Sequence, residues 1–385
     1  MISSLLLPAS LSVSVLHDLC PTLEWFHPFV RPQHSSNGWG IFAESDIPAN
    51  EVILKIPLSF TISIKNCTED ICQELEKVRK KLGNSKDIEE ISLAALLLLQ
   101  NSSYSRSIQK IVARTYPKIS LKVINEIIQP LIPELASKFY ILYSMVHEIS
   151  EIWMDRFEVD DTLNAVLSVT SRSFSLQQNE PSVIRQVSMV PCGDLFNHAD
   201  IDKVSVTYKL EDNALTFRTR GPCKKGDELF ISYGDKSHED LFFQYGFFIS
   251  DSPRNFVRLS LFQLDVMQNP IKQFLVQKFA VDSGKIKLTN EGLNEQHLAL
   301  VRAISVPNEE LTSYNLGRIF GLEKSPNDEC ETNAALLLEN LVFQELLKYK
   351  EVLENNDYIH GQLDDLFRVN IKILAKAWKR TRDFN

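Results

Sequence analysis

The chain has 385 residues, of which 44% are hydrophobic and 24% are charged, and its formal net charge at pH 7 is −9. This is a globular composition with room for two or three packed domains. The acidic balance argues against nucleic acid as a direct partner and suits a basic partner, such as a lysine-rich tail.

The cysteines and the N-terminal segment bear on the cell compartment. The six cysteines include no C-x-x-C pair, and their spacing predicts small buried thiols in a reducing compartment rather than a disulfide or zinc framework. The first residues, MISSLLLPASLSVSVL, are similar to the apolar part of a signal peptide, but they lack a basic region and Pro8 interrupts them. No other apolar run reaches the length of a membrane span. We therefore expect a cytoplasmic protein with no membrane partner, and the nucleus is the alternative location.

The first half of the chain predicts strands followed by helices. Residues 25–63 are rich in β-branched and apolar residues and carry a hairpin signal at Asn37-Gly38. Residues 69–152 have helical periodicity and strong helix formers, with a polar loop predicted at 101–107.

Strands return in the second half, before a long helical region. Short strand patterns occupy 187–233, around a turn at Glu211-Asp212-Asn213, and amphipathic helices are predicted from 254 onward. The order predicts a β-rich domain with a helical insertion, followed by a helical domain.

The first stretch with possible chemistry is NGWGIFAESDIPANEVILKIP at 37–57. Gly38 and Gly40 flank Trp39, so the backbone there can turn tightly and approach a ligand closely. Taken alone, a hairpin turn packed under a tryptophan explains this stretch better.

The second stretch, VTSRSFS at 169–175, places Arg172 in a weakly apolar segment. A guanidinium can hold a carboxylate in two parallel hydrogen bonds. An ordinary structural ion pair is the better local explanation.

The third stretch, PCGDLFNHAD at 191–200, places Asp194, Asn197 and His198 in a segment that otherwise has a core pattern. Buried polar groups need partners. A metal cluster with Asp200 and Asp202 is disfavoured, because metal-binding histidines usually occur in pairs and no second one lies near. A hydrogen-bonded core pair and a functional site remain equally good explanations.

The fourth stretch, KKGDELFISYGDKSHEDLFFQYGFF at 224–248, contains Tyr233 and Tyr245, each followed by glycine. A tyrosine at a strand end before a glycine turn is well placed to present its phenol to a site. The surrounding phenylalanines either line a dry pocket or pack in the core.

Together and in this order, these stretches resemble the SET-domain methyltransferases. The similarity is greatest to the subfamily of Rubisco large-subunit lysine methyltransferase and the fungal ribosomal-protein and elongation-factor lysine methyltransferases. The matching motifs are NGWGIFA, SRSF, DLFNH, ISYG and QYGF. The resemblance covers about residues 20–250, and it reaches the C-terminal region only in architecture.

The resemblance implies an α+β fold with a β-rich SET core, a helical insertion, and a C-terminal all-α substrate-binding domain. The segment with Asn197 and His198 would thread through a loop of the core as a pseudoknot. It places the first part of the core at 1–68 and the helical insertion at 69–160. The second part of the core, with the cofactor and acceptor site, falls at 161–250, and the substrate-binding domain at 251–385.

The resemblance also implies S-adenosylmethionine as methyl donor, without a metal. Tyr233 would be the catalytic tyrosine of the methyl-transfer channel, and Arg172 would hold the cofactor's carboxylate. The implied cofactor-binding residues are Asn37, Gly38, Trp39, Arg172, Asn197, His198 and Phe247. The implied substrate-binding residues are Asp194, Tyr208 and Tyr245.

These residue types suit methyl transfer to an amine. The reaction is an in-line displacement, so catalysis rests on positioning and on a dry channel lined with polar groups. An ordinary lysine, with a pKa of about 10.4, is protonated at pH 7 and must lose a proton first. Desolvation and the nearby sulfonium charge both favour that loss.

Departures from the family pattern argue against two classes of substrate. No cysteine-rich zinc segment follows the core, which argues against histones, and Leu176 stands where the plant enzyme has a basic residue, which argues against a Rubisco-like substrate. Asn50 replaces the usual glycine before Glu51, and asparagine tolerates the left-handed backbone conformation that this turn needs.

Three functions are therefore open. The leading one is a monomeric protein-lysine N-methyltransferase that acts on a ribosomal protein or elongation factor, with no direct nucleic-acid contact. The second is a protein-histidine N-methyltransferase of the same fold. The third is an inactive SET protein that acts as a binding module, against which the retention of Arg172, Asn197, His198 and Tyr233 argues.

Overall fold

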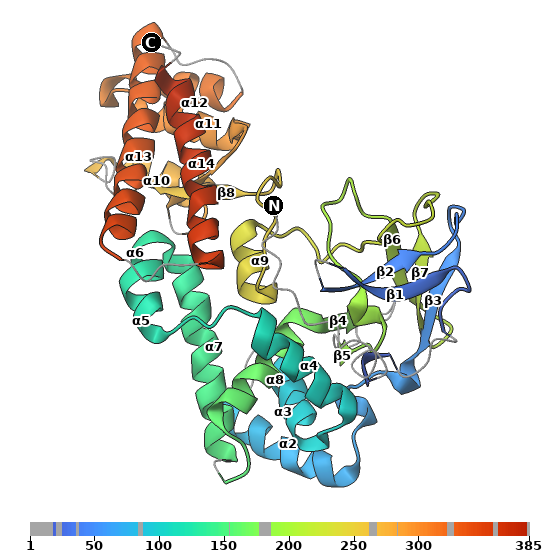
Figure 1. The fold of residues 1–385 in the computed structure, drawn as a ribbon. Coiled ribbons are helices and arrows are strands. Elements are labelled where there is room, and N and C mark those ends of the chain that lie inside the picture. The colour runs from blue at the N-terminus through green and yellow to red at the C-terminus, as the bar shows by residue number, and fades with distance from the viewer. Residues whose placement is uncertain are drawn as a thin grey trace. The chain divides into compact units, whose positions relative to one another are not determined.

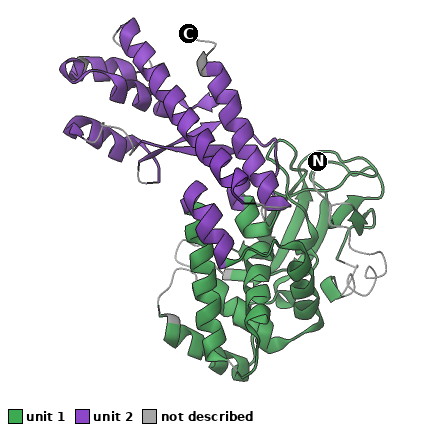
Figure 2. Cartoon of the chain, turned by 60° about the vertical axis from the view of Figure 1, so that its left-hand side comes forward, with its two compact units in different colours: residues 1–120, 134–236, 241–247 green, residues 121–133, 237–240, 248–385 purple. Residues whose placement is uncertain are grey.

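The computed structural model describes residues 18–20, 25–35, 38–83, 88–153, 155–176, 186–261, 268–282, 284–321, 327–356 and 361–382. The chain divides into two compact units, shown in different colours in Figure 2. The first unit comprises residues 1–120, 134–236 and 241–247, and the second comprises 121–133, 237–240 and 248–385. Each unit is described by itself.

The strands of the first unit form small antiparallel sheets among its described residues (Figure 1). One sheet pairs β1 (Val30–Ser35) with β2 (Gly38–Ala43). Another has the order β3-β7-β6, and a third pairs β4 with β5. The bounds of these strands are β3 (Val52–Pro57), β4 (Ser173–Leu176), β5 (Gln186–Met189), β6 (Val206–Glu211) and β7 (Ala214–Thr219).

Two turns form where the sequence predicts them. Glu211 pairs with Ala214, and the intervening Asp212 and Asn213 both have positive φ, at 50° and 56°. Two successive residues in this conformation make the tight turn that matches the twist of a hairpin. Asn50 also adopts the left-handed conformation, with a φ of 62°, so its predicted tolerance of this turn is confirmed.

Helices fill the sequence between β3 and β4, as predicted for the insertion, but they continue through α8 to Arg172, beyond the predicted end at 160. In the first unit, α3 packs against both α2 and α8, and α4 also packs against α8. The apolar run in α3 becomes core, with Leu93, Leu96 and Leu97 fully buried. The helices of this unit are α2 (Glu69–Leu82), α3 (Ile88–Gln100), α4 (Ser103–Thr115), α7 (Pro133–Ile152, from residue 134) and α8 (Val159–Arg172).

The segment with Asp194, Asn197 and His198 crosses the core of the first unit. It includes a short 3-10 helix, η5 (Gly193–Leu195), and Phe196 stacks on Phe217 of β7 with ring centroids 4.9 Å apart. A side chain on Gly193 would lie 3.0 Å from the Phe217 ring, so only glycine packs there without a shift. His198 then pairs in parallel with Ile231. This crossing lies where the sequence predicts a pseudoknot.

The second unit is mostly helical, and none of the described helices in either unit is long and apolar enough to cross a membrane. Its described elements are α5 (Leu121–Val123), a π-helical turn (Ile124–Ile128), α6 (Gln129–Leu131), α10 (Pro270–Phe279), α11 (Glu295–Ser305), η7 (Asn308–Glu310), α12 (Ser313–Phe320), α13 (Asp328–Glu354) and α14 (Gln362–Arg382). Helix α9 (His238–Tyr245) contributes residues to both units.

A small sheet in the second unit corrects the prediction of an all-α domain. Strands β8 (Phe256–Ser260), β9 (Lys285–Thr289) and β10 (Gly292–Leu293) pair in the order β10-β9-β8. Val257 and Leu259 are buried and alternate with the less buried Arg258, which is the period of a strand with one covered face. Helix α14 contacts β8 and β9. The predicted α+β class with a β-rich core and a helical insertion is confirmed.

The bonding state of the cysteines also differs from the prediction, which was that all of them are free thiols. Cys20 is bonded to Cys192, and Cys67 to Cys72, whereas Cys223 and Cys330 are buried free thiols. Cys20 and Cys192 are 172 residues apart in sequence, yet their Cα atoms lie 4.6 Å apart. Spacing along a chain carries no information about such a pairing. The Cys20–Cys192 bond attaches the N-terminal part of the chain to the segment that leads into Asp194.

We predict unequal contributions from the two disulfides to stability. A crosslink restricts the unfolded chain more when it closes a longer loop, so Cys20→Ala should lower the free energy of unfolding by about 5 kcal/mol and Cys67→Ala by about 2 kcal/mol. Urea denaturation without reductant measures both. Added dithiothreitol should bring the wild type close to a variant that lacks both bonds, and equal losses from the two single variants would contradict the prediction.

Candidate functional site

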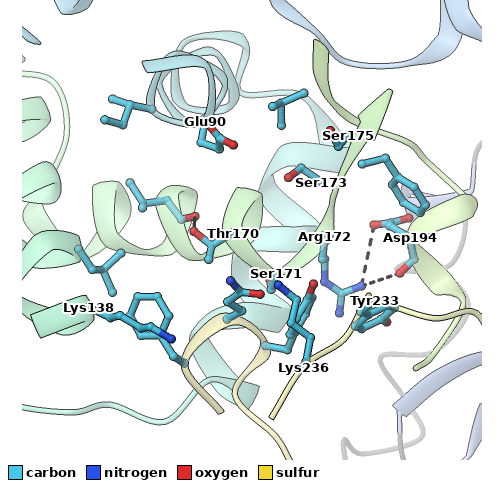
Figure 3. Close-up of a pocket in the computed structure, with 18 of the residues that line it drawn as sticks. Glu90, Lys138, Thr170, Ser171, Arg172, Ser173, Ser175, Asp194, Tyr233 and Lys236 are labelled. Carbon is cyan, nitrogen blue, oxygen red and sulfur yellow. Dashed lines mark hydrogen bonds and ion pairs between the residues drawn. The ribbon is translucent and has the colours of Figure 1, made fainter. Parts of the chain in front are cut away.

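A cavity of about 480 Å³ lies in the first unit, between the helical insertion and the strands of the core. Its walls come from α3, α7, α8, β4 and the ends of β5 and α9. Figure 3 shows Arg172, Asp194 and Tyr233 at one end of this cavity and Lys138 and Lys236 elsewhere along its wall. Five predicted site residues line it, namely Arg172, Asp194, Tyr208, Tyr233 and Tyr245.

The remaining described site residues form a second group, in contact with Tyr233. His198 stacks on the Tyr233 ring with centroids 5.1 Å apart, and the Phe247 ring lies 6.5 Å from both of these rings. Gly38, with a φ of 93°, begins β2 and is followed by Trp39. Asn197 joins this group through the Trp39 backbone, while Asn37 lies outside the described residues.

Asn197 is held by both backbone and side-chain contacts. Its Nδ2 donates to the carbonyl oxygen of Trp39 at 3.0 Å and to Oε1 of Glu228 at 2.6 Å. A Cβ atom on Gly40 would lie 2.3 Å from that Glu228 oxygen and 3.1 Å from Nδ2, so glycine is needed for this approach. Burial raises the pKa of Glu228, while the hydrogen bond from Asn197 opposes that rise.

Tyr233 connects the two groups. Its backbone N–H donates to Nδ1 of His198 at 3.1 Å, and its hydroxyl donates to the main-chain oxygen of Phe196 at 2.8 Å. On the cavity side, the Tyr245 ring centroid is 4.6 Å from that of Tyr233. Burial raises the pKa of Tyr233 well above its ordinary value, so its hydroxyl stays neutral at physiological pH. Burial also raises the pKa of Tyr245, to about 12.

Asp194 is the buried acid of the site. Its side chain is fully buried, and its Oδ2 accepts a hydrogen bond from the Tyr104 hydroxyl at 2.9 Å. Nη1 of Arg172 lies 3.9 Å from Oδ2 and donates to the Asp194 main-chain oxygen at 3.1 Å. Burial raises the pKa of Asp194 to about 6, although Arg172 and Tyr104 both act to lower it.

The walls of the cavity around Tyr208 are aromatic. Phe174 contacts Tyr208 edge-on with centroids 5.2 Å apart, and the Tyr208 ring lies 5.5 Å from Phe217. Phe243 lines the cavity, whereas Phe242 beside it is fully buried core, so both explanations offered for the phenylalanine cluster apply to different members. Tyr208 is 39% exposed, so it can contact a ligand that enters the cavity.

Sequence reasoning missed Tyr104 and Glu228. Tyr104 falls in the segment predicted as a polar loop, but α4 begins at Ser103 and Ser102 is its N-cap, accepting a hydrogen bond from Ser105 N–H. A serine before a helical pattern is a recognised start signal and could have indicated this helix. Nothing in the local sequence marks Tyr104 as a partner of Asp194, which is 90 residues away.

Arg172 fits the carboxylate of an amino-acid ligand. It offers a guanidinium of five N–H donors, of which the described contacts use only those on Nη1, and its side chain is 24% exposed. The amino-acid part of S-adenosylmethionine carries a carboxylate, which complements this guanidinium. Among the described residues, no group of three potential metal ligands comes together.

The comparisons with known proteins agree on one family. A family model described as the SET domain matches residues 38–234. Actin-histidine N-methyltransferase of Danio rerio is 22% identical over 309 residues, covering 74% of this chain and 50% of that protein. The Homo sapiens protein of the same name is 23% identical over 386 residues, covering 91% and 64%. The chain thus spans about half to two thirds of the length of these relatives.

Solved structures share the fold over nearly the whole chain. Rubisco LSMT bound to AdoMet superposes with a TM-score of 0.64 at 19% identity, covering 96% of this chain and 90% of that one. The SET domain of LSMT bound to lysine and AdoHcy gives a TM-score of 0.62 at 18% identity, covering 98% and 92%. At these identities the likeness establishes the shared fold.

We predict that Asp194 makes stability depend on pH. Its pKa in the folded protein, about 6, is above the ordinary 3.8, so the folded state binds the proton more tightly than the unfolded state. The stability that this group contributes is therefore present at low pH and lost as the pH rises from roughly 4 to 6. Over that range the free energy of unfolding of the wild type should fall relative to Asp194→Asn by about 3 kcal/mol. Urea denaturation at several pH values tests this, and a difference that does not change with pH would refute it.

Proposed function

We propose that this chain, which belongs to the SET-domain family, is an S-adenosylmethionine-dependent protein N-methyltransferase whose acceptor is a lysine side chain. The observation that carries the proposal is the position of Tyr233. Its ring contacts His198 on one side and Tyr245 at the cavity on the other. A phenol between a cofactor group and an acceptor cavity suits in-line transfer between two bound molecules, because it can orient both.

The residues that would hold S-adenosylmethionine are Gly38, Trp39, Arg172, Asn197, His198 and Phe247. When bound, this cofactor supplies a methyl group on a cationic sulfur. Arg172 would bind the cofactor's carboxylate, and the backbone around Trp39 would approach it closely because glycine lies on both sides. The Asn197 side chain, already bonded to the Trp39 carbonyl, would keep that backbone in place.

Tyr233 positions the reacting groups rather than exchanging a proton. Because its hydroxyl proton is directed to the Phe196 carbonyl, its oxygen lone pairs remain to accept a hydrogen bond from the acceptor amine. The same oxygen can accept weak C–H···O contacts from a methyl group in transfer. The high pKa of Tyr233 prevents it from acting as a base at neutral pH. The acceptor amine must therefore become neutral through desolvation in the cavity.

The aromatic walls favour lysine as the acceptor. Phe174, Tyr208 and Tyr245 line the cavity, and such rings suit the apolar stem of a lysine while its nitrogen reaches Tyr233. A histidine acceptor is the second candidate. It is favoured by the curated relatives, which are named actin-histidine N-methyltransferases. For the substrate, the subfamily resemblance supports a ribosomal protein or elongation factor, on which the enzyme would act as a monomer.

We expect two variants to separate cofactor binding from transfer. Asn197→Ala removes the hydrogen bond to the Trp39 carbonyl, so S-adenosylmethionine binding measured by calorimetry should be lost. Tyr233→Phe retains the ring stack on His198 and should keep cofactor affinity while turnover falls about 100-fold, the order seen when one positioned hydrogen-bonding group is removed from an active site. Full turnover by Tyr233→Phe would show that another residue orients the acceptor. Absence of cofactor binding by the wild type would favour the inactive binding module.

The acceptor can be identified directly. The purified protein and labelled S-adenosylmethionine are incubated with a lysate of cells lacking this protein, and the labelled band is analysed by mass spectrometry. We expect methyllysine in a ribosomal protein or translation factor, and Tyr233→Phe serves as the matched control for labelling. If the labelled residue is methylhistidine instead, the acceptor is histidine, the second candidate.

A further inference from the structure

The side-chain amide of Asn197 has a donor end and an acceptor end, and the protein itself uses only the donor end. Its Nδ2 carries two N–H groups. One donates to the Trp39 carbonyl at 3.0 Å, and the other donates to Oε1 of Glu228 at 2.6 Å. Both donors are therefore committed, and the remaining polar atom of the amide, Oδ1, can act only as an acceptor.

Oδ1 of Asn197 is accessible to a ligand. The residue is half-buried, and Oδ1 accepts no hydrogen bond from the described residues. Every buried side-chain oxygen without a partner among these residues belongs to another side chain, so Oδ1 retains exposed surface. The amide adjoins the Trp39 backbone and the next residue is His198, and the proposed function assigns both of these to the cofactor. An acceptor at this place suits an N–H group of that cofactor.

The Glu228 carboxylate is brought to the amide by strand pairing. Glu228 forms an antiparallel bridge with Phe42 of β2. The next residue, Leu229, donates its N–H to the Ile41 carbonyl at 2.7 Å. Gly40 leaves room for the carboxylate beside β2, since a Cβ atom there would overlap Oε1 of Glu228. The position of the acid is therefore set by the backbone of two paired segments.

Glu228 determines which end of the Asn197 amide faces outward. The last torsion of an asparagine side chain is broad and roughly two-fold, so the amide can turn over and exchange Nδ2 with Oδ1. Turned over, Oδ1 would face two other oxygens, the Trp39 carbonyl and the Glu228 carboxylate, and would be repelled by both. The carboxylate contributes more to this preference, because hydrogen bonds to an ionised acceptor are stronger than those to a neutral one.

We propose that Glu228 is a positioning residue for cofactor binding, which fixes the polarity of the Asn197 amide so that Oδ1 accepts a hydrogen bond from an N–H group of S-adenosylmethionine. The inference rests on the proposed methyltransferase function. Two groups of the cofactor carry such N–H donors, namely the α-ammonium and the amino group of the adenine. Both present the same chemistry to Oδ1, and a truncated ligand separates them.

The test compares Glu228→Gln with Glu228→Leu. Glutamine keeps an oxygen that can accept from Asn197, whereas leucine has a similar size and no acceptor. We expect Glu228→Leu to raise the Kd of S-adenosylmethionine in calorimetry about tenfold, and Glu228→Gln to raise it by less than about threefold. Glu211→Leu is the matched control, since Glu211 lies on β6 of the same unit and its carboxylate accepts from Arg218 instead. This control should leave the Kd unchanged.

Two further measurements distinguish orientation of the amide from a general structural role. In Glu228→Leu the KM of S-adenosylmethionine should rise, while the KM of the acceptor protein purified from the labelled band should not. A structural role would raise both. In the ligand-free protein, the side-chain amide proton resonances of Asn197 should move upfield in Glu228→Leu and less so in Glu228→Gln, because only leucine removes the acceptor.

Methylthioadenosine identifies the N–H group, because it has the adenine of S-adenosylmethionine but lacks the amino-acid part. If Glu228→Leu weakens the binding of S-adenosylmethionine and leaves that of methylthioadenosine unchanged, the partner of Oδ1 is the α-ammonium. If it weakens both by the same factor, the partner is the amino group of the adenine.

The proposal is overturned if Glu228→Leu binds S-adenosylmethionine as tightly as Glu228→Gln does. Should Glu228→Leu fail to fold, Asn197→Asp provides the test, because it places a carboxylate against Glu228 and the Trp39 carbonyl. Wild-type affinity for the cofactor in Asn197→Asp would overturn the proposal as well. Absence of cofactor binding by the wild type would instead refute the proposed function, and the Asn197 resonances would still report whether Glu228 holds the amide.

Discussion

The parallel pairing between the Asn197 segment and Ile231 is the interaction on which the site depends. Ile231 N–H donates to the Asn197 carbonyl at 3.0 Å, and Ala199 N–H donates to the Ile231 carbonyl at 3.2 Å. Upstream, the strand that contains Ile231 also bonds to β2, through Leu229 N–H and the Ile41 carbonyl at 2.7 Å. Asn197 lies about 160 residues after Ile41 and about 30 residues before Ile231, yet these hydrogen bonds bring the three segments side by side. Each bond satisfies a backbone group that would otherwise be buried unpaired.

Every assigned role of Tyr233 follows from that crossing. With Ile231 paired to the Asn197 segment, Tyr233 two residues later meets His198 through its backbone and Phe196 through its hydroxyl. The stack of Phe196 on Phe217 fixes the carbonyl that receives the hydroxyl proton, since a ring packed in a dense core cannot turn freely. In the proposed mechanism, the positioning of Tyr233 is a product of core packing, and it needs no group dedicated to that purpose alone.

The helical insertion contributes to the site as well as to the core. Arg172 ends α8, Tyr104 begins α4, and both contact the carboxylate of Asp194, which lies on the core segment. Burying an acid costs free energy, and the raised pKa of Asp194 records that cost.

The sequence by itself determined the α+β class, the helical insertion, the left-handed conformation at Asn50, the turn at Asp212-Asn213, and the family, because each depends on local periodicity, local backbone conformation or short motifs in a fixed order. It did not reveal the Cys20–Cys192 bond, the β8-β9-β10 sheet, or the contacts of Tyr104 and Glu228 with Asp194 and Asn197. The Cys20–Cys192 bond and the two side-chain contacts join residues far apart in the chain, and a single sequence holds no signal for distance in space. The Cys67–Cys72 bond, between residues five apart, was also missed, because the lack of a C-x-x-C pair favoured free thiols. Only the tertiary structure decided which groups contact the Asp194 carboxylate, because that depends on where α4 begins and α8 ends against the core.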